Sequence, residues 1–247
     1  MSHTPTELSP GLVVQGIKPP LALKNFKLIA FDMDSTLINI ECVDEIADFV
    51  GCKAEVAAIT EAAMQGVITD FKDSLRQRVG KLVGVTEADM ARVLAERLQL
   101  SPGAKELVQA AQKAGLKVLL VSGGFTYFAE HVRGLLGIDF VRANVLEMEG
   151  SVLTGGLVEQ AWGDICDGAE KRRTLLEVAS LMGISPQQAI AVGDGANDLP
   201  MLSLAGLGVA FRAKPLVRQN ANQAISSVGL DGVLYLLGVH DKDLNRA

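Results

Sequence analysis

A short apolar run that ends in two carboxylates is the feature that most constrains the fold of this chain. Leu28-Ile29-Ala30-Phe31 is apolar at every position, which is typical of a parallel strand covered on both faces, and Asp32 and Asp34 follow it. Residues two apart in an extended chain project to the same side, so the two acids start on one side of the strand end. They repel one another unless something compensates them, usually a divalent cation. On its own, the Asp-x-Asp pair fits an ordinary turn as well as a metal site.

Alternating strand and helix signals from residue 101 onward predict the rest of the sheet. In chain order we expect a helix at about 104–114, a strand at 117–121, a hairpin of strands 145–148 and 151–154, a helix at 170–182, and strands at 189–192, 209–211 and 224–226. This alternation predicts an α/β fold with a doubly wound, Rossmann-like parallel sheet.

The block between the first strand and residue 100 has helical rather than strand patterning. Phe71, Leu75 and Val79 recur at helical spacing, and Thr86-Glu87-Ala88-Asp89 resembles a capping box. We therefore expect a small helical subdomain over residues 42–99. The remaining divisions are expected to be an N-terminal arm at 1–22, an α/β core at 23–41 and 100–240, and a C-terminal tail at 241–247.

Composition excludes several classes of function. The chain has 23 Lys and Arg against 29 Asp and Glu, a net charge of −6, and no basic run, so we expect neither a nucleic acid nor a membrane partner. Its three cysteines form no CxxC pair, which fits reduced thiols in a cytoplasmic protein. Only three histidines are present, so a histidine-based triad or zinc centre lacks ligands. There is also no signal-peptide pattern and no apolar run approaching the ~18 residues of a membrane span.

Polar residues fall where the predicted strands end. Asp32 and Asp34 end one strand, Ser122-Gly123-Gly124 ends a second, and Asp194 with Asn197 and Asp198 ends a third. The carboxyl ends of parallel strands share one edge of the sheet, so these residues are expected to meet in one crevice. Lys171, near the start of a predicted helix, is within reach of the same crevice.

Each of these groups suits phosphoryl transfer. Asp32 fits a nucleophile that forms an aspartyl-phosphate, and Asp34 fits the general acid and base. Oxygen ligands from Asp32, Asp34 and Asp194 suit Mg²⁺, while Ser122, Gly123 and Lys171 suit the phosphoryl oxygens. Taken singly, Ser-Gly-Gly fits a tight turn and Lys171 fits a solvated helix face. A dinucleotide fingerprint at residues 193–198 is disfavoured because Asp194 would repel a pyrophosphate and the third glycine is missing.

Taken together, these four motifs resemble those of the haloacid-dehalogenase-type phosphatases, in order and spacing, over residues 26–225. The resemblance implies that the helical block is that family's inserted cap. It also implies that Asn197 assists at the phosphate or the water, and that Asp198 orients Lys171 and the metal shell.

Within that superfamily the chain resembles the phosphoserine phosphatases most, through residues 34–41 with 44–47 after them, Met64-Gln65-Gly66, and residues 71–79. This resemblance implies Mg²⁺-dependent hydrolysis of O-phosphoserine in serine biosynthesis. It further implies that Glu41 holds the substrate ammonium, Arg78 its carboxylate, and that Phe71 closes over the amino acid. One acid and one guanidinium suffice to recognise a zwitterion.

Other functions stay open at this point. They are a phosphotransferase that passes the phosphoryl group to homoserine, a phosphatase of broader small phosphomonoesters, and a catalytically silent binding module. The silent binding module is disfavoured because a protein that only binds has no need of the full set Asp32, Asp34, Lys171 and Asp194. Residues 1–25 are too short for a regulatory amino-acid-binding domain, so serine feedback through one is not expected. The oligomeric state is open, a homodimer included.

Overall fold

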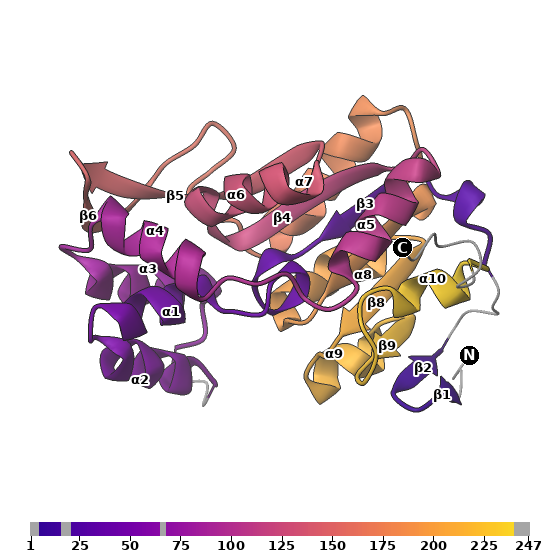
Figure 1. Cartoon of the computed structure of the whole chain (residues 1–247), viewed down its shortest axis with the longest axis horizontal. Helices are drawn as coiled ribbons and strands as arrows, with labels where there is room; N and C mark the ends of the chain where they lie inside the picture. Colours follow the sequence, from indigo (N-terminus) through magenta and orange to yellow (C-terminus); the bar gives the residue numbers. More distant parts are fainter. Residues whose placement is uncertain (1–4, 16–20, 65–67, 240–247) are drawn as a thin grey trace.

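The computed structural model describes residues 5–15, 21–64 and 68–239, and its centre is one sheet of nine strands (Figure 1). The strands lie in the order β1-β2-β9-β8-β7-β3-β4-β5-β6. Their bounds are β1 Thr6–Ser9, β2 Leu12–Val14, β3 Leu28–Phe31, β4 Lys117–Phe125, β5 Phe140–Glu149, β6 Val152–Val158, β7 Ala189–Gly193, β8 Leu207–Phe211 and β9 Gln223–Ile225.

The six central strands, β9 to β5 in this order, are mutually parallel. β3 lies in the middle, and all four of its residues are buried. Leu28 and Ala30 belong to the apolar cluster on one face of the sheet, whereas Ile29 and Phe31 belong to the cluster on the other. The doubly wound α/β fold is therefore confirmed. The strand order reverses around β3, which is where such sheets open a crevice at the carboxyl ends of their strands.

Helices cover both faces of the sheet. α5, α6 and α10 contribute to the larger apolar cluster and α7, α8 and α9 to the smaller one. The helix bounds are α1 Cys42–Phe49, α2 Lys53–Met64, α3 Phe71–Val79, α4 Glu87–Glu96, α5 Ala104–Lys113, α6 Thr126–Leu136, α7 Gly168–Leu181, α8 Leu199–Leu204, α9 Pro215–Asn220 and α10 Gly232–Leu236.

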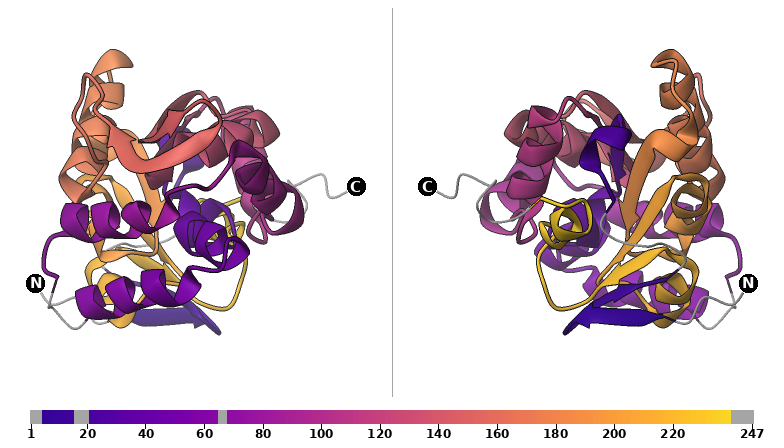
Figure 2. Two further views of the ribbon diagram at one scale, coloured as in Figure 1. Left: turned by 90° about the vertical axis from the view of Figure 1, so that its left-hand side faces the viewer. Right: turned by 90° about the vertical axis from the view of Figure 1, so that its right-hand side faces the viewer.

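Helices α1 to α4 form a separate layer beside the carboxyl edge of the sheet (Figures 1 and 2). The expected capping box is present, since Thr86 and Asp89 cap the first turn of α4 reciprocally. The hairpin β5–β6 joins this layer through backbone bonds such as Leu153 N–H to the Val85 carbonyl, 2.8 Å. The predicted hairpin turn is thus present, but its outer part packs on the helical layer instead of on the rest of the 100–240 segment.

The N-terminal segment differs from the expected loose arm. Of residues 1–22, the structure describes 5–15 and 21–22, and β1 and β2 form a hairpin whose second strand pairs antiparallel with β9. Leu12 and Val14 are buried against the core. Short strands bounded by Gly and Pro give too weak an alternation to be recognised in the sequence, and pairing with β9 stabilises them. The tail at 241–247 and Gln65-Gly66 lie outside the described residues. No described helix is long and apolar enough to cross a membrane.

Candidate active site

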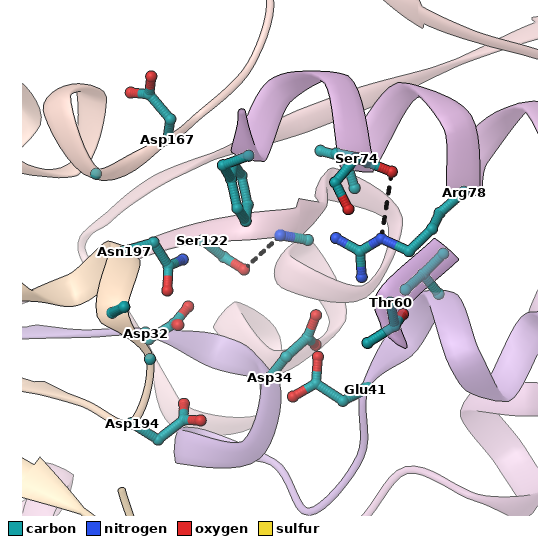
Figure 3. Close-up of a pocket in the computed structure, with 18 of the residues that line it drawn as sticks. Asp32, Asp34, Glu41, Thr60, Ser74, Arg78, Ser122, Asp167, Asp194 and Asn197 are labelled. Atoms are coloured by element: carbon teal, nitrogen blue, oxygen red, sulfur yellow. Dashed lines mark hydrogen bonds between the residues drawn. The ribbon is translucent and has the colours of Figure 1, made fainter. Parts of the chain in front are cut away.

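The predicted strand-end residues line a single cleft of about 710 Å³ between the sheet edge and helices α1 to α3 (Figure 3). Asp32, Asp34 and Asp194 lie on the sheet side of this cleft, and Glu41 and Arg78 lie toward the helical layer. The strand-end rule therefore places Asp32, Asp34 and Asp194 together correctly, whereas Glu41 and Arg78 are expected from the family resemblance alone. One side of the cleft holds paired carboxylates and the other holds an acid and a guanidinium.

Lys171 lies behind the cleft and joins one carboxylate that lines it, Asp32, to a buried one, Asp198. Its Nζ is 2.7 Å from Asp32 Oδ2 and 2.7 Å from Asp198 Oδ1, and the lysine is fully buried. Burial alone lowers the pKa of Lys171, but Asp198 and Asp32 outweigh that effect and raise the pKa above its ordinary value. The lysine is therefore a fixed positive charge. Burial and the neighbouring Asp198 raise the pKa of Asp32, and Lys171 partly opposes this shift.

Three carboxylates gather in the geometry of a cation site. One oxygen each from Asp32, Asp194 and Asp198 lies within 4.8 Å of the others. Burial and Asp198 raise the pKa of Asp194 to about 7, so a cation bound here would favour the ionised carboxylate. Thr36 Oγ1 donates to Asp194 Oδ1 at 3.0 Å and holds it in place. A cluster of hard oxygen donors suits Mg²⁺. The Asp34 side chain is not part of this group, so its predicted role as a ligand stays a prediction.

Asp34 lies in the tight turn Met33–Leu37 that follows β3. The Cys42 thiol donates to its Oδ1 at 2.9 Å, which orients the carboxyl group in the cleft. Burial and the nearby Glu41 raise the pKa of Asp34 to about 7, a value that suits a group exchanging protons near neutral pH. The chain thus places two acids two residues apart in different surroundings. Asp32 is paired with a lysine, whereas Asp34 faces a thiol and another acid.

The Ser122-Gly123-Gly124 segment forms the wall of the cleft beside Asp32. The Gly124 N–H donates to Ser122 Oγ at 2.8 Å, so the serine hydroxyl uses an acceptor site here and keeps its own proton for a ligand (Figure 3). A Cβ on Gly123 would lie 3.0 Å from Phe71 Cζ. Glycine at this position therefore lets Phe71, the first residue of α3, lie close over this segment without shifting.

The end of the cleft toward the helical layer carries Glu41 and Arg78. Ser35, whose φ of 54° is left-handed, donates its hydroxyl to Glu41 Oε1 at 2.5 Å. The Glu41 side chain borders the open cleft. The protein atoms around its carboxyl group remove part of its water, which raises its pKa. Arg78 Nε donates to the Ser74 carbonyl at 3.4 Å, and its guanidinium points into the cleft (Figure 3). Asp44 also lines this end, and its Oδ1 is buried with no hydrogen-bond partner among the described residues.

Asn197 and Asp198 complete the sheet side. Asp198 is fully buried, and its Oδ2 accepts from the Gly195 N–H at 2.9 Å while Oδ1 holds Lys171. Asn197 lines the cleft next to Asp32 (Figure 3). All the residues named as site candidates from the sequence therefore lie in or directly behind one cleft.

The sequence predicts no role for Thr36, Cys42 or Lys214, although each contacts or lines the site. Thr36 and Cys42 reach the site carboxylates because the chain turns after β3, and no periodic pattern in the sequence predicts that turn. Lys214 follows the end of β8 by three residues, so the strand-end rule that located Asp194 also applies to it.

Comparison with known proteins shows the family of this chain. A family model for haloacid dehalogenase-like hydrolases matches residues 26–206. The chain is 67% identical to a phosphoserine phosphatase of Albidiferax ferrireducens, over 94% of this chain and 98% of that protein. It is 65% identical to a phosphoserine phosphatase of a Polaromonas strain, over 94% and 99%. Among solved structures, a substrate-bound phosphoserine phosphatase complex superimposes with a TM-score of 0.78 at 36% identity, covering 85% of this chain and 97% of that one. The chain therefore belongs to the haloacid dehalogenase-like hydrolases, and among them to the phosphoserine phosphatases.

Proposed function

We propose that this chain hydrolyses O-phosphoserine to serine and phosphate through an aspartyl-phosphate on Asp32. The observation that carries the proposal is the division of one cleft into two ends. A carboxylate paired with a buried lysine faces Ser122 and Gly123 at one end, and Glu41 faces Arg78 at the other. A phosphomonoester of a small amino acid has matching ends, a dianionic phosphate and a zwitterion.

In the first step a carboxylate oxygen of Asp32 attacks phosphorus, and the bond from phosphorus to the serine oxygen breaks. Asp34 donates its proton to that leaving oxygen, so serine departs as the neutral alcohol. In this proposal Lys171, Ser122 and the Gly123 N–H stabilise the charge on the other phosphoryl oxygens. The Cys42 hydrogen bond supports this role of Asp34 because it keeps the carboxyl group turned into the cleft.

In the second step a water oxygen attacks phosphorus, and the bond from phosphorus to Asp32 breaks. Asp34, now ionised, takes a proton from that water and returns to its starting state. Asn197 lies on the same side of the cleft as Asp32, which supports its proposed role of holding the water or the phosphate. Neither step changes an oxidation state, so the reaction needs no redox partner.

The residues fit Mg²⁺, which would be held by the carboxylates of Asp32 and Asp194, with Asp34 as a further predicted ligand. The fit rests on hard oxygen donors within 4.8 Å of one another and on the raised pKa of Asp194. When bound, the cation supplies positive charge that favours ionised carboxylates and an electron-poor phosphate.

Substrate choice is proposed to come from the helical layer. Glu41 would hold the substrate ammonium, Arg78 the carboxylate, and Phe71 would cover the amino acid from its place against Gly123. In this proposal residues 42–99 act as a cap over a core formed by residues 23–41 and 100–240. The three cysteines are unpaired, which supports the proposed cytoplasmic location.

The test is phosphate release from a panel of phosphorylated amino acids and sugars, with Mg²⁺, with EDTA, and with homoserine added. We expect O-phosphoserine to give the highest kcat/KM and EDTA to stop turnover. Phosphohomoserine as the main product would favour phosphotransfer. Equal rates across the panel would favour a broader phosphatase and contradict the roles of Glu41 and Arg78.

A further inference from the structure

The phosphate-facing segment of β4 leaves the regular ladder of the sheet. Val121 pairs with Arg142 and Phe125 pairs with Asn144, so three residues of β4 face a single intervening residue of β5. Such a bulge leaves backbone groups without their usual partners, and buried groups of this kind need substitutes. The register with β3 also ends before the bulge, at Leu120. The shape of the segment therefore depends on contacts outside the ladder.

Asn144, fully buried on β5, supplies these contacts with its side chain. Its Nδ2 donates to the Gly123 carbonyl at 2.7 Å, and its Oδ1 accepts from the Cys166 N–H at 2.7 Å. The peptide between Gly123 and Gly124 is thereby held at both ends, because its N–H donates to Ser122 Oγ. Asn144 also ties this peptide to residue 166, just before α7, the helix that carries Lys171.

We propose that Asn144 is a positioning residue, which holds the bulge so that the Ser122 hydroxyl and the Gly123 N–H face the phosphate. The inference rests on the proposed phosphate-binding role of these two groups. A glycine pair in a bulge is otherwise free to rotate about its backbone torsions. With the Gly123 carbonyl unanchored, rotation about the Gly123 torsions would turn the preceding peptide, which carries the Gly123 N–H, away from the cleft. Asn144 does not line the cleft, so it acts only through the segment that it holds.

The test is the Asn144→Leu variant, which keeps the branched shape and the number of heavy atoms of the side chain and removes both hydrogen bonds. We expect kcat/KM for O-phosphoserine to fall about 10- to 100-fold, as for small displacements of catalytic donors. The inhibition constant for inorganic phosphate should rise at least about fivefold, because one aligned donor is lost. The inhibition constant for serine should stay within about twofold, since Glu41 and Arg78 lie at the other end of the cleft. Equal changes for phosphate and serine, or no change in either, would overturn the inference.

Two further variants separate positioning from general damage. Asn144→Asp keeps an acceptor for the Cys166 N–H, and burial favours its protonated form, which can still donate to the Gly123 carbonyl. At pH 5 its phosphate inhibition constant should therefore stay closer to that of the wild type than the constant of Asn144→Leu does. A loss of phosphate affinity at pH 5 as large as in Asn144→Leu would contradict the inference. Gln112→Leu is the matched control, since Gln112 Nε2 donates to the Leu136 and Gly137 carbonyls at 3.0 and 2.8 Å, far from the cleft residues. It should lower the unfolding temperature and leave both inhibition constants unchanged.

Ser122→Ala distinguishes failure of this inference from failure of the proposed phosphate site. If Ser122→Ala impairs phosphate binding and the Asn144 variants do not, only the role of Asn144 is overturned. If Ser122→Ala leaves kcat and the phosphate inhibition constant unchanged, the phosphate-binding role of the segment is overturned, and the role of Asn144 with it.

Discussion

Replacement of Lys171 by methionine should cost this protein both stability and activity, and the two losses should separate. Lys171 is fully buried, and its Nζ is 2.7 Å from an oxygen of each of Asp32 and Asp198. At that distance the Coulomb attraction is about 6 kcal/mol per pair for an effective dielectric constant of about 20, and desolvation offsets much of it. Methionine preserves the shape but leaves two carboxylates facing one another without a cation. Breaking such a buried pair costs about 3–5 kcal/mol of unfolding free energy.

The assay is urea unfolding at pH 8 in EDTA, so that no divalent cation replaces the lost charge, with turnover of O-phosphoserine measured on separate samples that contain Mg²⁺. We expect Lys171→Met to lose about 3–5 kcal/mol of unfolding free energy and at least about 10²-fold in turnover. The double variant Lys171→Met/Asp198→Asn removes one of the stranded charges, so it should regain at least about 1 kcal/mol without regaining turnover. A loss of stability below about 1 kcal/mol in the single variant, or restored turnover in the double variant, would refute the reasoning.

Three further predictions follow from the cleft and its surroundings. Asp34→Asn should slow turnover at least about 10²-fold because it removes the proton donor, and an unchanged steady-state rate would remove Asp34 from that role. Arg78→Ala should reduce kcat/KM for O-phosphoserine far more than for an aryl phosphate, which lacks the carboxylate; equal losses would contradict the assignment. Burial raises the pKa of Cys42 well above its ordinary value and that of Cys166 to about 12, whereas Cys52 is half-buried. A thiol-specific disulfide reagent should therefore modify one thiol in the native protein and three after unfolding. While the pH is below the pKa of the native reactive thiol, its rate should rise about tenfold for each unit that the pH increases. Rapid modification of two or three native thiols would contradict this.

The sheet side of the site was predictable because its residues follow from a simple rule. Apolar strands such as Leu28–Phe31 and Ala189–Val192 are recognisable, and the polar residues after them must meet at one edge if the strands are parallel. That reasoning places Asp32 and Asp194 near each other without knowledge of any contact. It cannot place Lys171, whose position depends on the packing of α7, and the structure brings the lysine to both Asp32 and Asp198.

Other parts of the site have no local signal. Cys42 reaches Asp34 only because the chain after β3 turns sharply at Ser35, where φ is positive for a residue other than glycine. Asn144 matters because of a bulge in the neighbouring strand, and a bulge is invisible in the strand's hydrophobic pattern. The N-terminal hairpin also lacks a local signal in the sequence, because its strands are stabilised by the pairing of β2 with β9.

The central claim, that Asp32 is the nucleophile of a phosphoserine phosphatase, is tested most directly by phosphate release from O-phosphoserine catalysed by Asp32→Asn. The amide keeps the size of the carboxyl group but is a far weaker nucleophile, and it no longer offers a negative charge to Lys171. The unfolding temperature of the variant is measured first to show that it is folded. Its turnover should then fall below a few per cent of the wild-type turnover. Retention of a larger fraction would contradict the covalent mechanism.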